Sequence, residues 1–506
     1  MNALSGVLLF LTDPVIILYL AIFVFLGIYV GAIPGLSVTM AASLLISFTF
    51  SWDPLSALAA ILGVQIGGVY GGSRSAILLN IPGTPAAVAT ALDGYSLAQK
   101  GFASQAFGVT IIQSVLGGFI GTIILAIGAP IISEFSLKFA PRDYFLLGIM
   151  GLLLIGSLGS ESTARGIFSA LVGLFIGVIG LDIVTGQQRF TFGNVYLMGG
   201  IHYVVVMLGL FGMSEALFQL RNLDVLPVKQ KVDKIRPDFK SIKKYIPLTI
   251  RSSLLGTFVG ALPGTGGDIA ALMAYDQARR TTKNPEVPFG QGAIEGLVAP
   301  ESANNAAIGG AYIPMLTLGI PGDAVTAIVL GAMFIHGFRP GPLFMTESPH
   351  IFGFMVAGNI IGNIFLLIFG FMGIKLTVKI VEIPKHILMP IIIVLSVVGA
   401  YAINNSVADI YYMMGFGIFG YFLKLYHFPS APMILGVILS QLVEQNYRRG
   451  VSMVGNNLIA FIIDLFANPI SIVLIIMIGL MLITQSKFWI NFREKREKAK
   501  DIKISE

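Results

Sequence analysis

The sequence contains no cysteine and few charged residues. The absence of cysteine excludes disulfide bonds, thiolate metal sites and cysteine nucleophiles. Asp, Glu, Lys and Arg make up 11% of the 506 residues, whereas a typical soluble protein has about 25%. No Lys or Arg precedes Arg74, so the start lacks the basic region of a cleaved signal peptide. We therefore expect the first apolar segment to be a retained membrane helix.

A catalytic set is also missing. No Ser/His pair and no pair of intramembrane Asp residues is evident, so a hydrolase or an intramembrane protease is not expected. The glycine-rich segment 67–80 lacks the Lys-Ser/Thr that ends a phosphate-binding P-loop, which argues against nucleotide binding. No cofactor and no enzymatic activity are predicted. The histidines are scattered without metal-ligand spacing, at His202, His336, His350, His386 and His427.

Long apolar runs dominate what is present. Hydrophobic residues make up 55% of the chain, and runs of about 20 residues, enough to span a bilayer, recur from Pro14 to Thr484. The sequence predicts an all-α polytopic membrane protein in contact with membrane lipid. We expect about 11–12 transmembrane segments, some of them re-entrant. The clearest spans in the first half are residues 14–33, 55–79, 104–132, 144–158, 166–181 and 196–218, and a final span covers residues 458–484.

One basic stretch interrupts the apolar pattern. Residues 221–244 hold eight basic and three acidic residues, so the positive-inside rule places this linker in the cytoplasm, with the tail from Lys487. A net charge of +6, concentrated in loops, indicates orientation and not a nucleic-acid partner. The predicted organisation is a first transmembrane repeat (1–220), a basic cytoplasmic linker (221–247), a second repeat (248–450), a final helix (451–486) and a cytoplasmic tail (487–506).

The second half repeats the pattern of the first. GAIPGLSVTMAASLL (31–45) and GALPGTGGDIAALMA (260–274) are identical at six of fifteen positions. LNIPGTPAAV (79–88) corresponds to LGIPGDAVTA (318–327). If the first half crosses the membrane an odd number of times, the second half is inverted. Inverted-topology repeats with broken helices are the common plan of secondary transporters.

Four Pro-Gly pairs mark the helix breaks of the two repeats. A single pair in a membrane segment is usually a kink or a loop boundary, but four pairs in corresponding places favour a shared site. Pro and Gly end a helix, and Thr84 before Pro85 predicts an N-cap and a new helix from about Pro85. Helix N-termini that face a cavity attract anions. The polar groups at these starts, which can cap helices or bind substrate, are Ser37, Thr39, Thr84, Thr265 and Asp323.

Further polar residues lie in apolar surroundings. Tyr70, Ser73 and Asn80 need hydrogen-bond partners, either a substrate or a neighbouring helix. Glu301 is a functional candidate if it lies within the bilayer, and a solvated helix-terminal charge if it lies in a loop. The polar stretch 275–292 before it places Glu301 near an interface. Asn304 and Asn305 offer amide oxygens to a cation such as sodium, although helix capping is an equal alternative.

The chain resembles the large membrane subunit of the tripartite tricarboxylate transporter family. NIPGTPAAVATALDGYSLAQKG (80–101), APESANNA (299–306) and LGIPGDAVTA carry this resemblance, which extends from Gly31 to about residue 450. It implies a multi-pass permease of the bacterial cytoplasmic membrane that imports di- or tricarboxylates such as citrate, driven by a sodium or proton gradient. It also implies two partners, a small membrane subunit and a periplasmic or lipid-anchored substrate-binding protein.

The resemblance and the repeated breaks together define the candidate site residues. Ser37 and Thr265 occupy positions that vary within the family, where substrate identity can reside. Asp323 would repel an anion, so we interpret it as a cap or a cation ligand. The candidates for coupling-ion binding are Glu301, Asn304, Asn305 and Asp323. The candidates for substrate binding are Pro34, Gly35, Ser37, Tyr70, Gly71, Gly72, Ser73, Asn80, Pro82, Gly83, Thr84, Pro263, Gly264, Thr265, Pro321 and Gly322.

Two alternatives stay open from the residues alone. A passive channel, or a structural partner of another permease, would share the broken helices but show flux without ion coupling, or no flux. A membrane enzyme acting on an amphipathic substrate has only the polar residues at membrane depth in its favour.

Overall fold

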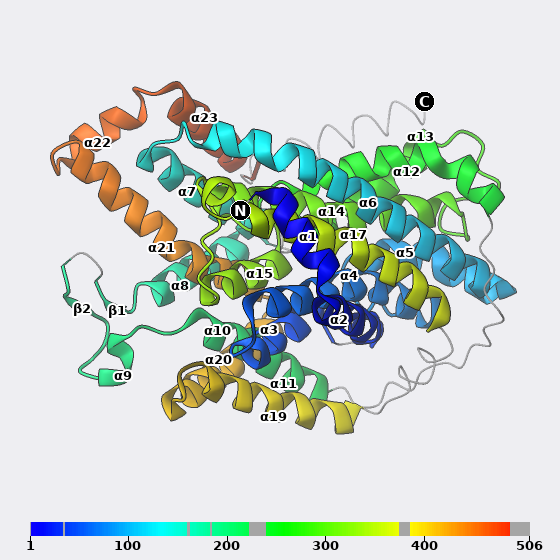
Figure 1. The fold of residues 1–506 in the computed structure, drawn as a ribbon, viewed down its shortest axis with the longest axis horizontal. Coiled ribbons are helices and arrows are strands. Elements are labelled where there is room, and N and C mark those ends of the chain that lie inside the picture. The colour runs from blue at the N-terminus through cyan, green and yellow to red at the C-terminus, as the bar shows by residue number, and fades with distance from the viewer. Residues whose placement is uncertain are drawn as a thin grey trace, which may run out of the picture. The chain divides into compact units, whose positions relative to one another are not determined.

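A computed structural model describes residues 2–33, 36–158, 162–182, 185–221, 239–373 and 385–485. The chain divides into two compact units, which are described separately. The first comprises Met1–Leu137 and Ile179–Tyr426, and the second Lys138–Val178 and His427–Glu506. Within the described ranges the elements are helices, except for one antiparallel pair, β1 (Gly180–Leu181) and β2 (Gln188–Arg189). Figure 1 shows this helical architecture, and the all-α prediction is confirmed.

The first two long helices begin at the same kind of signal. In α2 (Pro14–Ala32) and α4 (Pro54–Leu79) an Asp side chain accepts hydrogen bonds from the first free amides, and Pro follows it at the first helical position. The predicted helices at 14–33 and 55–79 are confirmed. The elements around them are α1 (Ala3–Thr12), α3 (Val38–Thr49), α5 (Ala87–Leu97), the π-helix η1 (Ala98–Phe102) and α6 (Ala103–Ser136).

The rest of the first unit comes from the middle of the chain. Within it α12 begins at Phe239, so residues 239–247, assigned to the linker from their charge, are helical. Tyr245 and Thr249, one turn apart, are both buried and continue the inner face of α12. The elements are α9 (Val195–Met198), α10 (Tyr203–Met207), the π-helix η2 (Leu208–Met213), α11 (Ser214–Leu220), α12 (Phe239–Gly260), α13 (Gly266–Thr281), α14 (Glu295–Leu318), α15 (Ala324–Ile335), α16 (Phe344–Glu347), α17 (Pro349–Met372), α19 (Lys385–Asn404) and α20 (Val407–Leu425).

The second unit combines helices from both halves of the sequence. It contains α7 (Pro141–Leu158), α8 (Thr163–Gly177), α21 (Ser430–Met453), α22 (Leu458–Leu465) and α23 (Pro469–Gln485). α21 packs against α7 and α8. The final span is not one helix, because α22 and α23 meet at an angle of 86°. Asn468 accepts the Ile470 amide and Pro469 opens α23, so the local sequence starts a new helix there.

Glycine allows the long helices of the first unit to approach closely. A methyl group at Gly27 of α2 would lie 2.7 Å from the carbonyl oxygen of Val64 in α4. One at Gly256 of α12 would overlap the carbonyl oxygen of Ala303 in α14. The contacts of Gly31 with Gly68 and of Gly260 with Ala307 repeat this arrangement one turn later. Small residues of this kind bring backbones together in membrane proteins.

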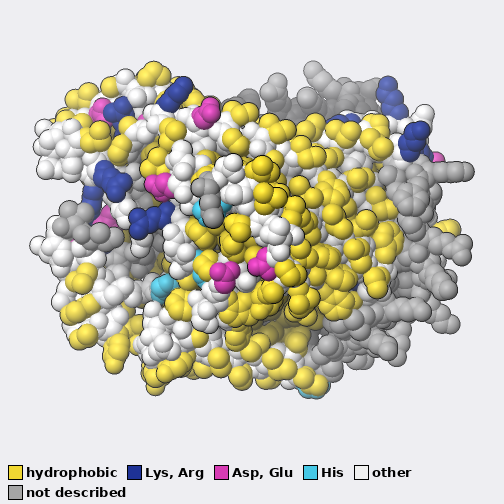
Figure 2. Space-filling model, in the orientation of Figure 1, with side chains coloured by type: hydrophobic (Ala, Val, Ile, Leu, Met, Phe, Trp, Pro, Cys, Tyr) yellow, Lys and Arg dark blue, Asp and Glu magenta, His cyan; other side chains and the backbone are white. Residues whose placement is uncertain are grey.

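Several helices are long and apolar enough to cross a membrane. Six described helices satisfy this by length and composition, and the bent pair α22–α23 adds a seventh if it counts as one span. Large apolar side chains such as Leu8, Ile127 and Phe258 are exposed. Figure 2 shows hydrophobic side chains over broad areas of the visible face. This surface fits contact with lipid, and the chain is a multi-pass membrane protein. The count of 11–12 segments stays a prediction.

The α2–α4 contact predicts that a single methyl group is destabilising there. Gly27→Ala should lower the free energy of unfolding by about 1–3 kcal/mol, because the added carbon meets backbone atoms that have little room to move. Gly415→Ala in α20 is the control, since no atom lies within 4 Å of its added carbon. Thermal unfolding of the detergent-purified proteins measures both effects. Equal melting temperatures for the two variants would contradict this interpretation.

Candidate functional site

The break between α4 and α5 is held by backbone contacts. α4 ends at Asn80, which is exposed and adopts the left-handed conformation (φ 54°). The amide of Gly83 donates to the carbonyl oxygen of Gly72 in α4 (3.2 Å). A methyl group at Gly83 would overlap the carbonyl oxygen of Gly31. The α4–α5 break therefore lies against the end of α2, where the other predicted break of this half begins. Pro34 and Gly35 lie outside the described residues.

Thr84 does not cap α5, contrary to the prediction. The helix starts at Ala87, close to the expected position, and its N-cap position is Ala86, without a side-chain hydrogen bond. Thr84 instead packs against α4, where only a glycine at position 72 leaves room for its hydroxyl group. That hydroxyl group is buried, with 6% of the residue exposed, and has no hydrogen-bond partner. A buried polar atom without a partner is costly and needs an explanation.

The break between α14 and α15 resembles the break between α4 and α5 in its backbone conformation. α14 ends at Gly319 in the left-handed conformation (φ 72°), and Pro321 and Gly322 follow in an irregular segment. The amide of Gly264 donates to the carbonyl oxygen of Gly322 (2.7 Å). This bond joins the two breaks of the second half.

The helix starts in the second half carry different caps. Asp323 caps α15 in a capping box, in which it accepts the Thr326 amide (2.7 Å). Thr265 makes no side-chain cap at α13, because its hydroxyl group donates to the carbonyl oxygens of Val259 and Leu262. Of the two roles considered for Asp323, the structure thus contains the cap.

Asp268 was not singled out from the sequence. It lies in the first turn of α13 and is exposed, and its carboxyl group lies near the backbone amide of Ala86. It also interacts electrostatically with Asp323. Asp268 therefore links the start of α13 in the second half to the start of α5 in the first half. Its position in the repeated segment GALPGTGGDIAALMA was the only available signal.

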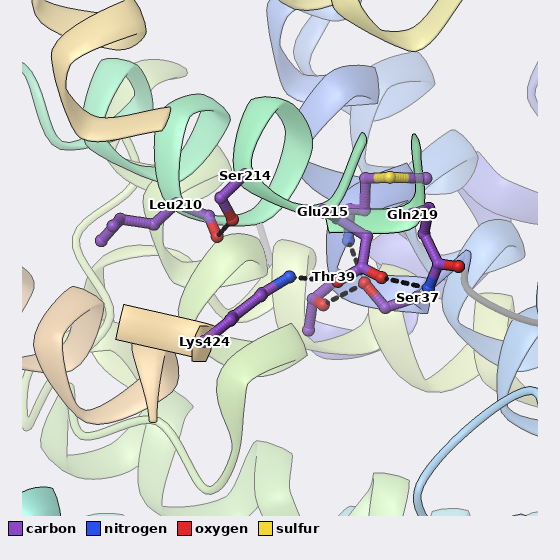
Figure 3. A network of polar contacts seen from close by, with 8 residues as sticks. Ser37, Thr39, Leu210, Ser214, Glu215, Gln219 and Lys424 are labelled. Carbon is purple, nitrogen blue, oxygen red and sulfur yellow. Dashed lines mark hydrogen bonds and ion pairs between the residues drawn. The ribbon is translucent and has the colours of Figure 1, made fainter. Parts of the chain in front are cut away.

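Ser37 caps α3 and lies in a polar region of the first unit (Figure 3). Its hydroxyl group accepts the Met40 amide (3.0 Å) and lies 2.8 Å from that of Thr39. The same close-up contains the ion pair between Lys424 of α20 and Glu215 of α11, and Gln219 donates to Glu215 at 2.8 Å. Glu215 lies two residues after the end of the π-helix η2, and π-helical turns are frequent at functional sites. This ion pair was not predicted from the sequence.

Glu301 is surrounded by hydroxyl groups from three other helices. Its Oε1 accepts hydrogen bonds from Ser73 of α4 and Thr90 of α5, both at 2.5 Å. Its Oε2 accepts one from Ser114 of α6 at 2.8 Å. Only 1% of Glu301 is exposed, so the alternative of a solvated terminal charge does not fit. Ser73 and Glu301 were predicted in separate roles, but the structure brings them together and adds Thr90 and Ser114, which the sequence reasoning missed.

The two asparagines after Glu301 have different surroundings. Asn304 packs its side-chain oxygen against Gly267, next to Asp268. Asn305 donates its amide to the carbonyl oxygen of Glu301 (3.0 Å), while its own Oδ1 is buried without a partner. Asn305 and Thr84 thus both present unpaired polar oxygen atoms inside the first unit.

Tyr70 and Gly71 serve packing in this structure. Tyr70 is fully buried, and the guanidinium group of Arg74 lies 5.2 Å from the centre of its ring. Arg74 donates to the carbonyl oxygen of Gly370 (2.6 Å) near the end of α17, where a cation complements the helix dipole. A methyl group at Gly71 would overlap the carbonyl oxygen of Ile28 in α2. These contacts separate Tyr70 and Gly71 in role from the residues of the breaks.

Asp93 fixes the loop that leads into α14. Its Oδ1 accepts the backbone amides of Gly290 (2.9 Å), Gly292 (2.8 Å) and Ala293 (2.7 Å). Its Oδ2 accepts the hydroxyl group of Tyr275 (2.9 Å). Asp93 lies one turn after Thr90 in α5, so two neighbouring side chains of α5 bind the second half. This role of Asp93 was not predicted from the sequence.

Comparison with known proteins gives one family. Residues 17–435 match the family described as the tripartite tricarboxylate transporter TctA family. Two curated relatives come from Agrobacterium vitis. The chain is 38% identical over 459 residues, 90% of each chain, to the "uncharacterized 52.8 kDa protein in TAR-I ttuC' 3'region". It is 39% identical over 216 residues to the "uncharacterized protein in TAR-II ttuC' 3'region", covering 43% of this chain and 87% of that protein.

Removing the Asp93 carboxylate should release the loop before α14. Asp93→Ala leaves three amides without their acceptor, so we expect a loss of about 2–4 kcal/mol in the free energy of unfolding and faster tryptic cleavage near Arg280. Asp276→Ala is the control, because its ion pair with Arg280 is exposed and contributes little. Cleavage rates that are the same in both variants would show that Asp93 does not hold the loop.

Proposed function

This chain belongs to the tripartite tricarboxylate transporter TctA family, and from that premise we propose that it is the large permease subunit of a carboxylate importer. The imported substrates are di- or tricarboxylates of the citrate type. The permease works in the bacterial cytoplasmic membrane with a small membrane subunit and a periplasmic or lipid-anchored binding protein. An ion gradient, of sodium or protons, drives the uptake.

Matched helix contacts support a plan of two repeats. The contacts of Gly27 with Val64 and of Gly31 with Gly68 recur between α12 and α14 at the positions that align with them. Asn80 and Gly319, which end α4 and α14 in the same left-handed conformation, are also aligned. We infer that α2–α4 and α12–α14 are equivalent units, on either side of a linker of which residues 222–238 fall outside the described residues.

Two side-chain hydrogen bonds between α4 and α14 support the inverted relation of these repeats. Ser73, late in α4, bonds Glu301, early in α14. Gln65, earlier in α4, accepts the hydroxyl group of Tyr312, later in α14. The two helices therefore run antiparallel where they meet. Equivalent helices that run in opposite directions are what inverted-topology repeats require.

The proposed substrate site rests on one observation, which is that the two helix breaks of each half are in contact. Gly83 meets Gly31 in the first half, and Gly264 bonds Gly322 in the second. Free amides at helix starts are anion-binding groups, each worth about 0.3–2 kcal/mol. Weak, distributed attraction of this kind allows a carboxylate to leave again. The unpaired hydroxyl group of Thr84 lies at this position and is a ready donor.

Uptake by the complete transporter tests the proposed function. Cells that express the chain with its two partner subunits should accumulate labelled citrate or a related di- or tricarboxylate. The accumulation should require the binding protein and should collapse when one of the two ion gradients is removed. Flux that persists without either gradient would identify a passive channel. If none of the labelled di- and tricarboxylates accumulates although all subunits are present in the membrane, carboxylates are excluded as the substrates.

Thr84→Val tests the substrate site with little structural disturbance. The substitution keeps the size of the side chain and removes a hydroxyl group that has no partner, so the melting temperature should change little. If that group donates to the substrate, the KM for uptake should rise about tenfold, the equivalent of one hydrogen bond. Thr317→Val is the control, because its hydroxyl group bonds the carbonyl oxygen of Ile313 in its own helix. An unchanged KM for Thr84→Val would remove Thr84 from the site.

A further inference from the structure

Glu301 has the surroundings of a group that gains and loses a proton. The three hydroxyl groups that reach it come from α4, α5 and α6, and Ser73, Thr90, Ser114 and Glu301 are each at most 1% exposed. Among the residues that the structure describes, Glu301 forms no ion pair. Its charge is offset by neutral dipoles alone.

The other charged and titratable groups near α14 are engaged elsewhere or lie farther away. Tyr70 interacts electrostatically with Glu301, whereas Arg74 is bonded to the end of α17 and Asp93 to the loop before α14. Among the described residues, none of these charged or titratable groups forms a hydrogen bond or an ion pair with the Glu301 carboxyl group. The helices that pack against α14 also carry charged or titratable groups, among them the exposed Glu134 of α6, Asp268 of α13 and Glu347 of α16, the partly buried Arg251 of α12 and the buried Tyr275 of α13.

The hydroxyl groups allow both charge states of Glu301 to be satisfied. A buried carboxylate without a counterion is costly, and uptake of a proton removes the charge. A hydroxyl group is both donor and acceptor, and its hydrogen rotates freely about the C–O bond. When Glu301 is ionised, all three hydroxyl groups donate to it. When it is protonated, one of them accepts the hydrogen of the carboxyl group instead of donating to it.

The distances favour a proton over a metal cation. Hard cations lie about 2.0–2.6 Å from each oxygen ligand, so an ion placed between two oxygen atoms holds them well apart. Ser73 and Thr90 lie 2.5 Å from Oε1, which leaves room for a hydrogen atom but not for an ion between the oxygen atoms.

We propose that Glu301 is the proton-binding site that couples transport to the proton gradient. The proton comes from water on one side of the membrane, forms an O–H bond with a carboxyl oxygen of Glu301, and returns to water on the other side. This inference rests on the proposed permease function and names the coupling ion that it left open.

Glu301→Gln tests the proposal, because glutamine mimics a permanently neutral side chain. The complete transporter is placed in proteoliposomes, and labelled citrate, or the carboxylate that proves to be transported, is the probe. Wild type should accumulate it under a proton gradient without sodium. In the Glu301→Gln variant this accumulation should be at least about tenfold lower. The variant should still exchange internal for external substrate at a rate near that of the wild type. Glu295→Gln, an acid-to-amide change in the first turn of the same helix, should behave as wild type.

Each other outcome counts against a specific claim. Proton-driven accumulation that persists in Glu301→Gln, or wild-type accumulation that follows sodium alone, overturns the proton site and leaves the permease function intact. A wild type that neither accumulates nor exchanges any carboxylate overturns the permease function, and the proton site with it.

Ser114→Ala provides a second variant that keeps the carboxyl group, in case Glu301→Gln does not fold. It removes the donor to Oε2, which stabilises the ionised form. The pH at which proton-driven uptake is half-maximal should therefore move upward by about 0.7 pH unit, the equivalent of one hydrogen bond. An unchanged pH profile in folded Ser114→Ala protein contradicts the proposal.

Discussion

Backbone polar groups that leave a helix inside an apolar bundle must find partners within the protein, and this constraint governs the first unit. At the break after α4, the Gly83 amide bonds the Gly72 carbonyl oxygen. In the second half, the Gly264 amide bonds the Gly322 carbonyl oxygen. Both bonds need backbones in direct contact, which side chains larger than hydrogen would prevent at Gly83 and Gly322. The backbone hydrogen bonds at the breaks and the close packing of α2 with α4 thus have the same requirement, which is direct contact between backbones.

Hydrogen bonds to carboxylates connect the two halves of the sequence, in addition to the ion pair of Lys424 with Glu215. Glu301 of α14 accepts hydroxyl groups from α4, α5 and α6, and Asp93 of α5 accepts amides of the loop before α14. Asp268 of α13 lies near the amide of Ala86, just before the start of α5. The short helix α5 is therefore held at Thr90 and at Asp93 by groups of the second half. Hydrogen bonds to ionised acceptors are stronger than neutral ones, so few contacts suffice for a helix of this length.

The sequence predicted the elements that depend on local signals. Apolar runs set the length of α2 and α4, and Pro-Gly pairs mark the breaks after α4 and α14, so the positions of these elements were found. Thr90 and Ser114 were missed because a single hydroxyl residue in an apolar helix usually bonds its own backbone. Thr84 was assigned as a cap from its local sequence, but the contact with Gly72 directs its side chain to α4 instead. These failures share one cause, since each depends on which distant helix lies opposite.

The caps also make the two pairs of breaks chemically unequal. In the first half the caps are neutral: Ser37 covers the start of α3, and the hydroxyl group of Thr84 stays unpaired. In the second half Asp268 and Asp323 place carboxylates at the starts of α13 and α15, and Asp268 lies near the Ala86 amide that precedes α5. Negative charge at a helix start competes with an incoming anion for the same amides. A carboxylate substrate held between the breaks would therefore be drawn toward the first half, with the acidic side left to cations or to groups that carry protons.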